Sequence, residues 1–185
     1  FNVVYYGTFI PNHGVLYIAE AAKILCTHKD IHFTFIGEGP DRQQAIEFME
    51  KNSLNNITFI EWLNQESLIK HMAQADISLG AFGTTPQSLM TVQNKIYEGL
   101  ALKLPVISGE SPAVNQTFNH RENIYLCDRT NPETLANAIL DLYSDSTLRN
   151  KIAEKGFAEY QNKYSLKKLG ERYLAHLSLL PHRYQ

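Results

Sequence analysis

The sequence predicts a doubly wound α/β fold, in which helices cover both faces of a parallel sheet of about six strands. Short apolar segments rich in β-branched and aromatic residues recur along the chain, and each is typical of a buried strand. Segments with helical periodicity lie between them. Strands that alternate with helices in this way indicate repeated βαβ units, which build parallel sheets.

The predicted strands are all short and bounded by turn-forming residues. They are residues 2–7, 31–36, 57–60, 76–80, 104–108 and 123–127. The first predicted helix follows the first strand, where Leu16, Ala19 and Ala22 begin an apolar face. Further helices are predicted over residues 41–52 and 66–74, and a fourth begins near Asn94.

The C-terminal part contains helices without intervening strands. Asn131 is a good N-cap with Pro132 at the first helical position, and Asp145 or Ser146 can cap the next helix, which runs to about Tyr160. We therefore expect a helical appendage to the sheet.

A last helix is predicted after a cap at Ser165. Its apolar residues fall on one side: Leu166, Leu169, Tyr173, Leu177 and Leu180. Charged residues lie beside this stripe: Lys163, Lys167, Lys168, Glu171 and Arg172. A solvated face is the simplest interpretation, and contact with a membrane surface or with a further domain is the alternative.

Composition excludes several classes of protein. The chain has 185 residues, 44% of them hydrophobic, which suits one folded domain and argues against disorder. With 17 basic against 19 acidic residues, nucleic acid is a poor candidate partner. No apolar run approaches the roughly 18 residues of a membrane span. Cys26 and Cys127 show no zinc-site spacing, so we expect reduced thiols and a cytoplasmic protein.

The chain opens directly on a predicted strand. Residues 1–7 form a β-rich apolar segment without an initiator Met or a leader pattern. We therefore expect a piece of a longer protein.

Two glycine-rich loops follow the first two strands, at the sheet edge where open α/β sheets bind ligands. Gly7 and Gly14 enclose the first loop, and His13 lies just before a helix start, where an anion would be stabilised. The second loop begins like a dinucleotide fingerprint with Gly37 and Gly39, but Arg42 occupies the third glycine position. NAD binding is therefore disfavoured.

Two later segments carry further candidates. Trp62, the only tryptophan, leaves the third strand and could belong to the core or line a pocket for a base. In residues 91–107, Asn94 can cap a helix whose first turn holds Lys95, with Glu98 immediately after. Exposed amides and a lysine suit an anion, and a carboxylate accepts hydrogen bonds from hydroxyls. A sugar nucleotide offers both groups.

Other catalytic motifs are absent from the sequence. It has no G-x-S-x-G, Walker or H-E-x-x-H motif. His28 and His32 have i,i+4 spacing, but His32 falls in a predicted strand, so they share no helix face.

Taken in order, the segments GTFIPNHG, FIGEGP, FIEWL, ADISLGAFG, NKIYEGLALKLPVIS and NPETLANAI resemble the C-terminal, donor-binding domain of retaining GT-B glycosyltransferases of family 4, also called group 1. The similarity covers nearly the whole chain. It implies a Rossmann-like domain over residues 1–162 and a C-terminal helix and tail, residues 163–185, that pack toward a missing N-terminal acceptor domain. The nucleotide sugar would then lie in the cleft between the two domains.

The resemblance implies a role for particular residues. Glu98 matches the later of two family glutamates and would bind ribose hydroxyls, whereas Gln93, Asn94 and Lys95 match the loop that holds the diphosphate. Segments that shape the nucleoside pocket or the first loop supply the remaining candidates: Gly7, Thr8, His13, Gly37, Glu38, Gly39, Pro40, Glu61 and Trp62.

The chain departs from the family pattern at three of these functional positions. Met90 occupies the position of the earlier glutamate, which contacts the donor sugar. Thr8 and His13 stand where the family has an Arg and a Lys that neutralise the leaving diphosphate. We hypothesise that Lys95 supplies one positive charge instead, and His13 another when protonated.

These expectations combine into one functional hypothesis. The chain is the donor half of a retaining, metal-independent glycosyltransferase that needs no cofactor, acts in bacterial surface polysaccharide or glycoconjugate synthesis, and lies in the cytoplasm or at the inner face of the membrane. Its partners would be the nucleotide-sugar donor and the missing acceptor domain, with peripheral membrane contact through the full-length protein. Acceptor-side catalytic residues would lie in that domain, so the fragment alone would be inactive. The alternatives are a degenerate nucleotide- or partner-binding module and a GT-B sugar-nucleotide epimerase.

Overall fold

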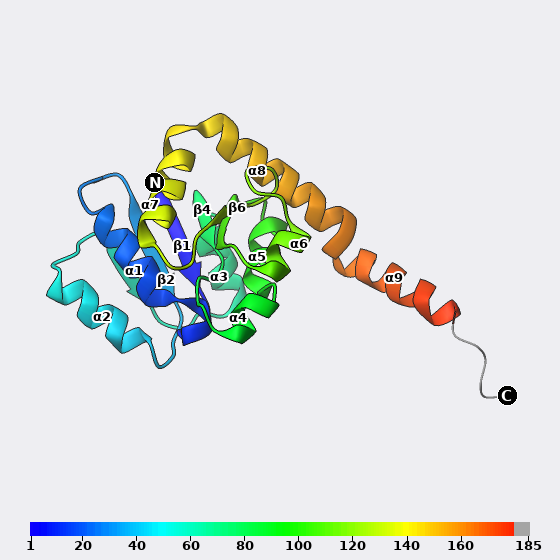
Figure 1. Cartoon of the computed structure of the whole chain (residues 1–185), viewed down its shortest axis with the longest axis horizontal. Helices are drawn as coiled ribbons and strands as arrows, with labels where there is room; N and C mark the ends of the chain where they lie inside the picture. Colours follow the sequence, from blue (N-terminus) through cyan, green and yellow to red (C-terminus); the bar gives the residue numbers. More distant parts are fainter. Residues whose placement is uncertain (180–185) are drawn as a thin grey trace.

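The computed structural model describes residues 1–179 and contains one six-stranded sheet (Figure 1). All five strand pairings are parallel, and the strand order is β3-β2-β1-β4-β5-β6. The strands are β1 (Asn2–Tyr6), β2 (His32–Ile36), β3 (Ile57–Ile60), β4 (Ile77–Leu79), β5 (Val106–Gly109) and β6 (Tyr125–Cys127). The predicted doubly wound fold is confirmed, and each predicted strand is present with ends displaced by at most two residues.

Helices connect the strands and extend the chain beyond the sheet. They are α1 (Val15–Ile24), α2 (Arg42–Lys51), α3 (Gln65–Met72), α4 (Pro86–Met90), α5 (Asn94–Ala101), α6 (Pro112–Thr117), α7 (Pro132–Ser144), α8 (Ser146–Glu159) and α9 (Leu166–Ser178). A 3₁₀ turn, η1 (Pro11–His13), precedes α1, and a π-helical turn, η2 (Tyr160–Tyr164), joins α8 to α9. The short helices α4 and α6 were not predicted, because five or six residues show too little periodicity.

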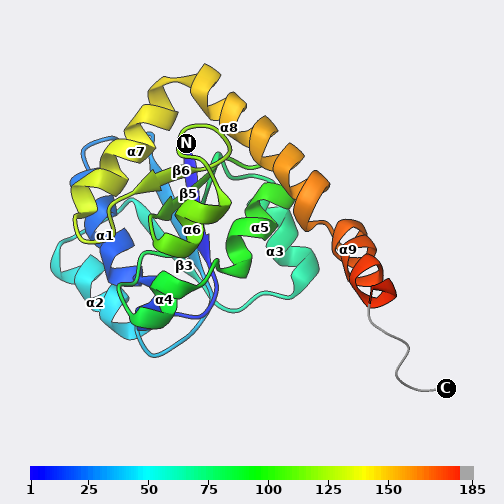
Figure 2. The same cartoon turned by 45° about the vertical axis from the view of Figure 1, so that its right-hand side comes forward.

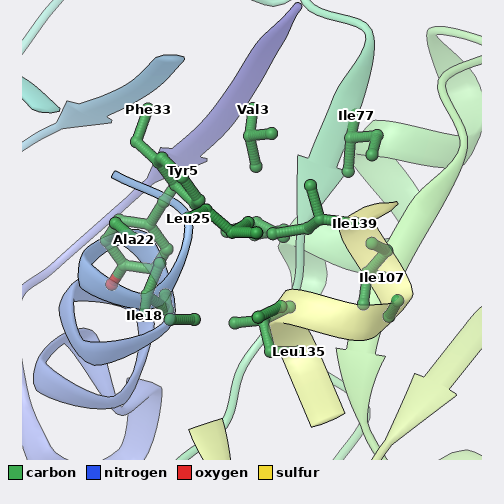
Figure 3. Close-up of a cluster of buried hydrophobic side chains, with 14 of the residues drawn as sticks. Val3, Tyr5, Ile18, Ala22, Leu25, Phe33, Ile77, Ile107, Leu135 and Ile139 are labelled. Atoms are coloured by element: carbon green, nitrogen blue, oxygen red, sulfur yellow. The ribbon is translucent and has the colours of Figure 1, made fainter. Parts of the chain in front are cut away.

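The two faces of the sheet are covered by different helices. Side chains of α1 and α7 pack over one face of the central strands, as Figure 3 shows for Ile18 and Ile139. Successive residues of a strand point to opposite faces. Tyr5 therefore belongs to this core, whereas Tyr6 belongs to a second cluster with Met72 of α3. These two adjacent tyrosines approach the same sheet edge from opposite sides.

The predicted caps of the later helices are confirmed. The Asn131 side chain accepts a hydrogen bond from the Glu133 amide, and Asp145 accepts one from the Leu148 amide. Ser165 accepts one from the Lys168 amide at the start of α9. Each cap satisfies an amide that has no partner within its own helix.

Helix α9 projects away from the sheet (Figures 1 and 2). Its apolar stripe is exposed, with 85% of Leu166 and 65% of Tyr173 accessible. Leu180 and the rest of the predicted tail lie outside the described residues, and the predicted boundary near residue 162 falls inside η2. Within residues 1–179, no helix is long and apolar enough to cross a membrane.

Both cysteines are free, as the sequence predicts. Cys127 is buried in the core, whereas Cys26 is half-buried in the turn after α1. Burial raises the pKa of the Cys127 thiol to about 12.

Candidate functional site

A cavity of about 520 Å³, called here the switch-point cavity, opens at the carboxyl edge of the sheet, between the end of β1 and the segment of chain that follows β4. The strand order reverses between these two strands, and ligands of open α/β folds bind outside such a point. Its volume lies within the range of small-molecule sites. Three segments of the chain line it, namely the end of β1 with its following loop, the segment after β3, and the start of α5: Tyr6, Gly7, Thr8, His13, Trp62, Thr91, Val92, Gln93, Asn94, Lys95 and Glu98.

The first two glycine-rich loops pack directly on each other. Gly7 and Gly37 both have φ +129°, and a Cβ on Gly37 would lie 2.2 Å from the Gly7 carbonyl oxygen. The Phe9 amide donates to the Glu38 carbonyl at 2.8 Å. A Cβ on Gly39 would in turn lie 2.5 Å from the Phe9 carbonyl oxygen. The second loop therefore braces the first one, which carries the cavity wall.

The loop after β4 is joined to the same region through Asn12. The Thr85 hydroxyl donates to the Asn12 side-chain oxygen at 2.5 Å, and the Ser88 hydroxyl donates to its backbone carbonyl at 2.7 Å. The buried Arg129 guanidinium donates to Ser88 and to the Gly83 carbonyl. These bonds hold the loops after β1 and β4 against each other at the switch point.

Helix α5 begins at the cavity with open backbone amides. Its N-cap is Gln93 and not Asn94, so the predicted cap is wrong by one residue. The Gln93 side-chain amide donates instead to the Ser88 carbonyl and the Thr91 hydroxyl, and it caps nothing. No hydrogen bond among residues 1–179 uses the amides of Asn94 or Lys95. A helix N-terminus in this state favours an anion.

Lys95 is the main charged group of this wall. Only 5% of the residue is exposed, and its Nζ lies 4.3 Å from the centroid of the Tyr5 ring. This ammonium has no hydrogen-bond partner among the described residues. Burial lowers the pKa of Lys95 to about 7, although the nearby Glu98 acts in the opposite direction. A buried cation without a partner indicates a place for an anionic ligand.

His13 lies near the end of the first loop, at the last position of η1. Its Nδ1 donates to the Thr8 carbonyl at 2.6 Å, because that oxygen can only accept. Nε2 therefore remains available to the cavity. Burial and the positive charge of Lys95 lower the pKa of His13, so the imidazole is neutral at pH 7 in the free chain.

Glu98 lies on the next turn of α5 and is exposed. Its Oε2 accepts a hydrogen bond from the hydroxyl of Tyr6, the last residue of β1. Burial and the carboxylate together raise the pKa of Tyr6 far above its ordinary value, so the phenol stays protonated and always donates.

Trp62 is 64% exposed, so the interpretation of Trp62 as a core residue is wrong. It borders the switch-point cavity and also a small one of about 30 Å³ that Gly37 and Leu63 help to line. A flat aromatic face at this place can stack on a planar ring.

The structure brings most of the predicted site residues together. Eight of them line the switch-point cavity, namely Gly7, Thr8, His13, Trp62, Gln93, Asn94, Lys95 and Glu98, and Gly37 lines the small one. Glu38, Gly39, Pro40 and Glu61 line neither, and their roles in ligand binding stay predictions.

The sequence reasoning missed Tyr6, Thr91 and Val92, which also line the switch-point cavity. Strand position could have indicated Tyr6, because it directly precedes the first cavity glycine.

Among residues 1–179, no group of three or more His, Cys, Asp or Glu side chains could hold a metal ion. The cavity is thus equipped to bind an anion and hydroxyl groups together.

Comparison with known proteins gives a family match and several relatives. The family described as "Glycosyl transferases group 1" matches residues 1–145. An uncharacterized glycosyltransferase of Methanocaldococcus jannaschii is 26% identical over 89% of this chain and 44% of its own length. A lipopolysaccharide core biosynthesis glycosyltransferase of Rhizobium meliloti, LpsD, is 23% identical over 94% of this chain and 48% of its own length. The chain thus spans about half the length of the curated relatives it matches.

Solved structures share the fold. Anabaena HepE, crystallised with UDP and glucose, superposes with a TM-score of 0.84 at 18% identity, over 97% of this chain and 48% of HepE. The C-terminal domain of a group 1 glycosyl transferase from Francisella tularensis, LpcC, has a TM-score of 0.74 at 22% identity, over 89% of this chain and 86% of that one.

Proposed function

Since this chain belongs to the glycosyl transferases of group 1, we propose that its switch-point cavity binds the nucleotide diphosphate sugar donor of a retaining glycosyltransferase. The diphosphate would lie at the N-terminus of α5 against Lys95, and the ribose hydroxyls would bind Glu98. The base would stack on Trp62.

The observation that carries this proposal is the pairing of Lys95 with the open end of α5. A buried ammonium without a partner and two unused amides converge on one cavity wall. The charge of a diphosphate would satisfy all three groups at once. A carboxylate one turn further along the same helix suits the vicinal hydroxyls of a ribose.

The proposed chemistry is orientation of the donor and stabilisation of the leaving diphosphate. When donor binds, its negative charge raises the pKa of Lys95, so the ammonium form is present during departure of the diphosphate. The proposal requires no metal and no cofactor, because Lys95 and the helix N-terminus would meet the charge. The transfer would proceed with retention of anomeric configuration.

The relatives support a more specific assignment. HepE was crystallised with UDP and glucose, which favours UDP as the first nucleotide to test. LpsD is named for lipopolysaccharide core synthesis, which favours an acceptor in surface polysaccharide or glycoconjugate synthesis. We place the protein in the cytoplasm, at the inner face of the membrane when its acceptor is lipid-linked.

The other half of the enzyme would be an N-terminal acceptor domain. The exposed apolar stripe of α9 is available to pack against it, with Tyr173 and Leu177 among its residues. Residues that contact the acceptor would belong to that domain, so the 185-residue chain alone would transfer no sugar.

Calorimetric titration with UDP, GDP and ADP tests this function, in the chain and in the full-length protein. We expect at least one of them to bind both, and the full-length protein to release that nucleotide from its sugar conjugate with EDTA present. Absence of binding by the full-length protein would refute the proposal.

A second candidate is a nucleotide-binding module without transfer activity. Met90 favours it, because a side chain that is 79% exposed replaces the carboxylate expected to hold the donor sugar. Binding by the full-length protein without hydrolysis or transfer from any nucleotide sugar would support this candidate.

A further inference from the structure

Tyr6 occupies an unusual position at the end of β1. Its side chain is only 6% exposed and belongs to the apolar cluster beneath α3, yet its hydroxyl reaches the cavity edge. There it contacts two groups of α5, the Glu98 carboxylate and, at 3.4 Å, the Lys95 carbonyl. The strand thereby touches the helix that forms the proposed anion site.

The hydrogen bond from Tyr6 orients an otherwise unrestrained carboxylate. No other hydrogen bond and no ion pair among residues 1–179 involves the Glu98 side chain. An exposed glutamate without such a contact samples several rotamers and must be ordered when it binds a ligand. Because the Tyr6 hydroxyl is held on a buried strand, its hydrogen bond orders the carboxylate before ligand binds and removes much of the entropic cost of ordering it.

The geometry also leaves acceptor capacity for a ligand. An ionised carboxylate offers about four lone-pair positions on its two oxygens. Tyr6 uses one of them on Oε2, so Oε1 and the second position on Oε2 remain for two neighbouring hydroxyls. The phenol can donate only one hydrogen bond, and it donates that bond to the Glu98 carboxylate and not to the more distant carbonyl of Lys95.

We propose that Tyr6 is the positioning residue for Glu98, and that the pair makes the site select a ribose over a 2′-deoxyribose. This inference rests on the proposed function, since it names the sugar that Glu98 would recognise. A carboxylate held in place loses one hydrogen bond when the 2′-hydroxyl is missing, whereas a mobile one can reorient and compensate.

The test compares Tyr6→Phe with the wild-type chain. Calorimetry would measure the dissociation constants of UDP, GDP and ADP and of their 2′-deoxy forms. The nucleotide that binds tightest is then used for the comparison, which is the ratio of the dissociation constant of its 2′-deoxy form to its own. Since the lost bond is a hydrogen bond to a charged group, we expect the wild type to bind the ribonucleotide roughly tenfold or more tighter than its 2′-deoxy form. We expect Tyr6→Phe to reduce this ratio to about threefold or less, while retaining binding of the ribonucleotide.

Tyr125→Phe is the matched control. Tyr125 is also a buried tyrosine at the end region of a strand, and its hydroxyl donates to the Asp141 carboxylate at 2.6 Å. It lies on β6, which β4 and β5 separate from β1. The loss of a tyrosine–carboxylate bond is therefore similar, but the ratio should keep its wild-type value.

A double variant separates positioning from general destabilisation. Glu98→Gln should lower the ratio by itself, and adding Tyr6→Phe to it should change the ratio no further. A wild-type ratio in Tyr6→Phe, with binding that depends on Glu98, would overturn this inference and leave the proposed function intact. Absence of nucleotide binding by the wild-type full-length protein would overturn both.

Discussion

Replacing Lys95 by Met should make the free protein more stable, although it removes a residue of the proposed site. Met has a similar length and no charge to desolvate. Burial lowers the pKa of Lys95 from 10.5 to about 7, and at roughly 1.4 kcal/mol per pH unit the charged form costs about 5 kcal/mol of folding free energy. The variant should recover most of this amount at pH 6, where the wild-type lysine is protonated in both states.

The sign of the pH dependence follows from the lowered pKa. Between about pH 7 and pH 10.5 the unfolded chain binds a proton at Lys95 that the folded chain has released. The free energy of unfolding of the wild type therefore rises with pH across this window, as far as this group determines it. The advantage of Lys95→Met should shrink in the same window.

Urea unfolding at pH 6, 8 and 9.5 measures both effects. Lys70→Met is the control, because Lys70 is a surface lysine paired with Glu66 and its removal should change stability by less than about 1 kcal/mol at every pH. The reasoning is refuted if Lys95→Met destabilises the chain at pH 6, or if its difference from the wild type is the same at pH 6 and pH 9.5.

Three further predictions concern binding and backbone strain. Wild-type affinity for a nucleoside diphosphate should fall as pH rises from 7 to 9, because bound phosphate raises the pKa of Lys95. In Lys95→Met, calorimetry should show affinity that is roughly tenfold or more weaker and no longer depends on pH in this range. A pH dependence that persists in the variant would contradict the role of Lys95 in binding the diphosphate. Bound nucleotide should quench the fluorescence of Trp62, the only tryptophan of the chain, because the base stacks on its ring. Trp62→Ala should weaken nucleotide binding by about tenfold. Unchanged emission at saturating nucleotide would exclude stacking of the base on Trp62. Gly37→Ala should lower the free energy of unfolding, measured in urea, by roughly 2–4 kcal/mol, because of the positive φ and the clash with Gly7. Gly170→Ala, whose new Cβ would meet nothing within 4 Å, should not lower it. Equal effects of the two substitutions would contradict the packing of the two loops.

The strands could be predicted from sequence because the sheet is buried on both faces. Most strand residues are then apolar on both faces, although Thr34, Ser78 and Ser108 interrupt β2, β4 and β5. The parallel order also explains why loops far apart in the sequence could be expected to meet at one edge. The cap of α5 was misplaced because Asn94 is the better cap by residue type, whereas Gln93 takes that position and directs its side chain to Ser88.

The inner details of the site depend on contacts that no local pattern encodes. Tyr6 and Glu98 are separated by 92 positions in the chain, and only the docking of α5 against β1 brings them together. Lys95 could be named from sequence as a candidate cation and it lines the cavity, but its burial against the Tyr5 ring follows from helix placement. Trp62 could not be assigned to core or cavity, because its exposure depends on the path of the chain after β3.

The most direct test of the central claim is an amide NMR titration of the 185-residue chain with UDP, GDP and ADP, which detects binding even when it is weak. The chain has its own core, and the C-terminal domain of LpcC was crystallised by itself. We predict that one nucleotide shifts the amides of Gly7, Asn94 and Lys95 and the Trp62 indole most strongly. Shifts centred instead on the separate cavity near Glu110, or no shifts at millimolar nucleotide, would contradict the assignment of a donor site to the switch point.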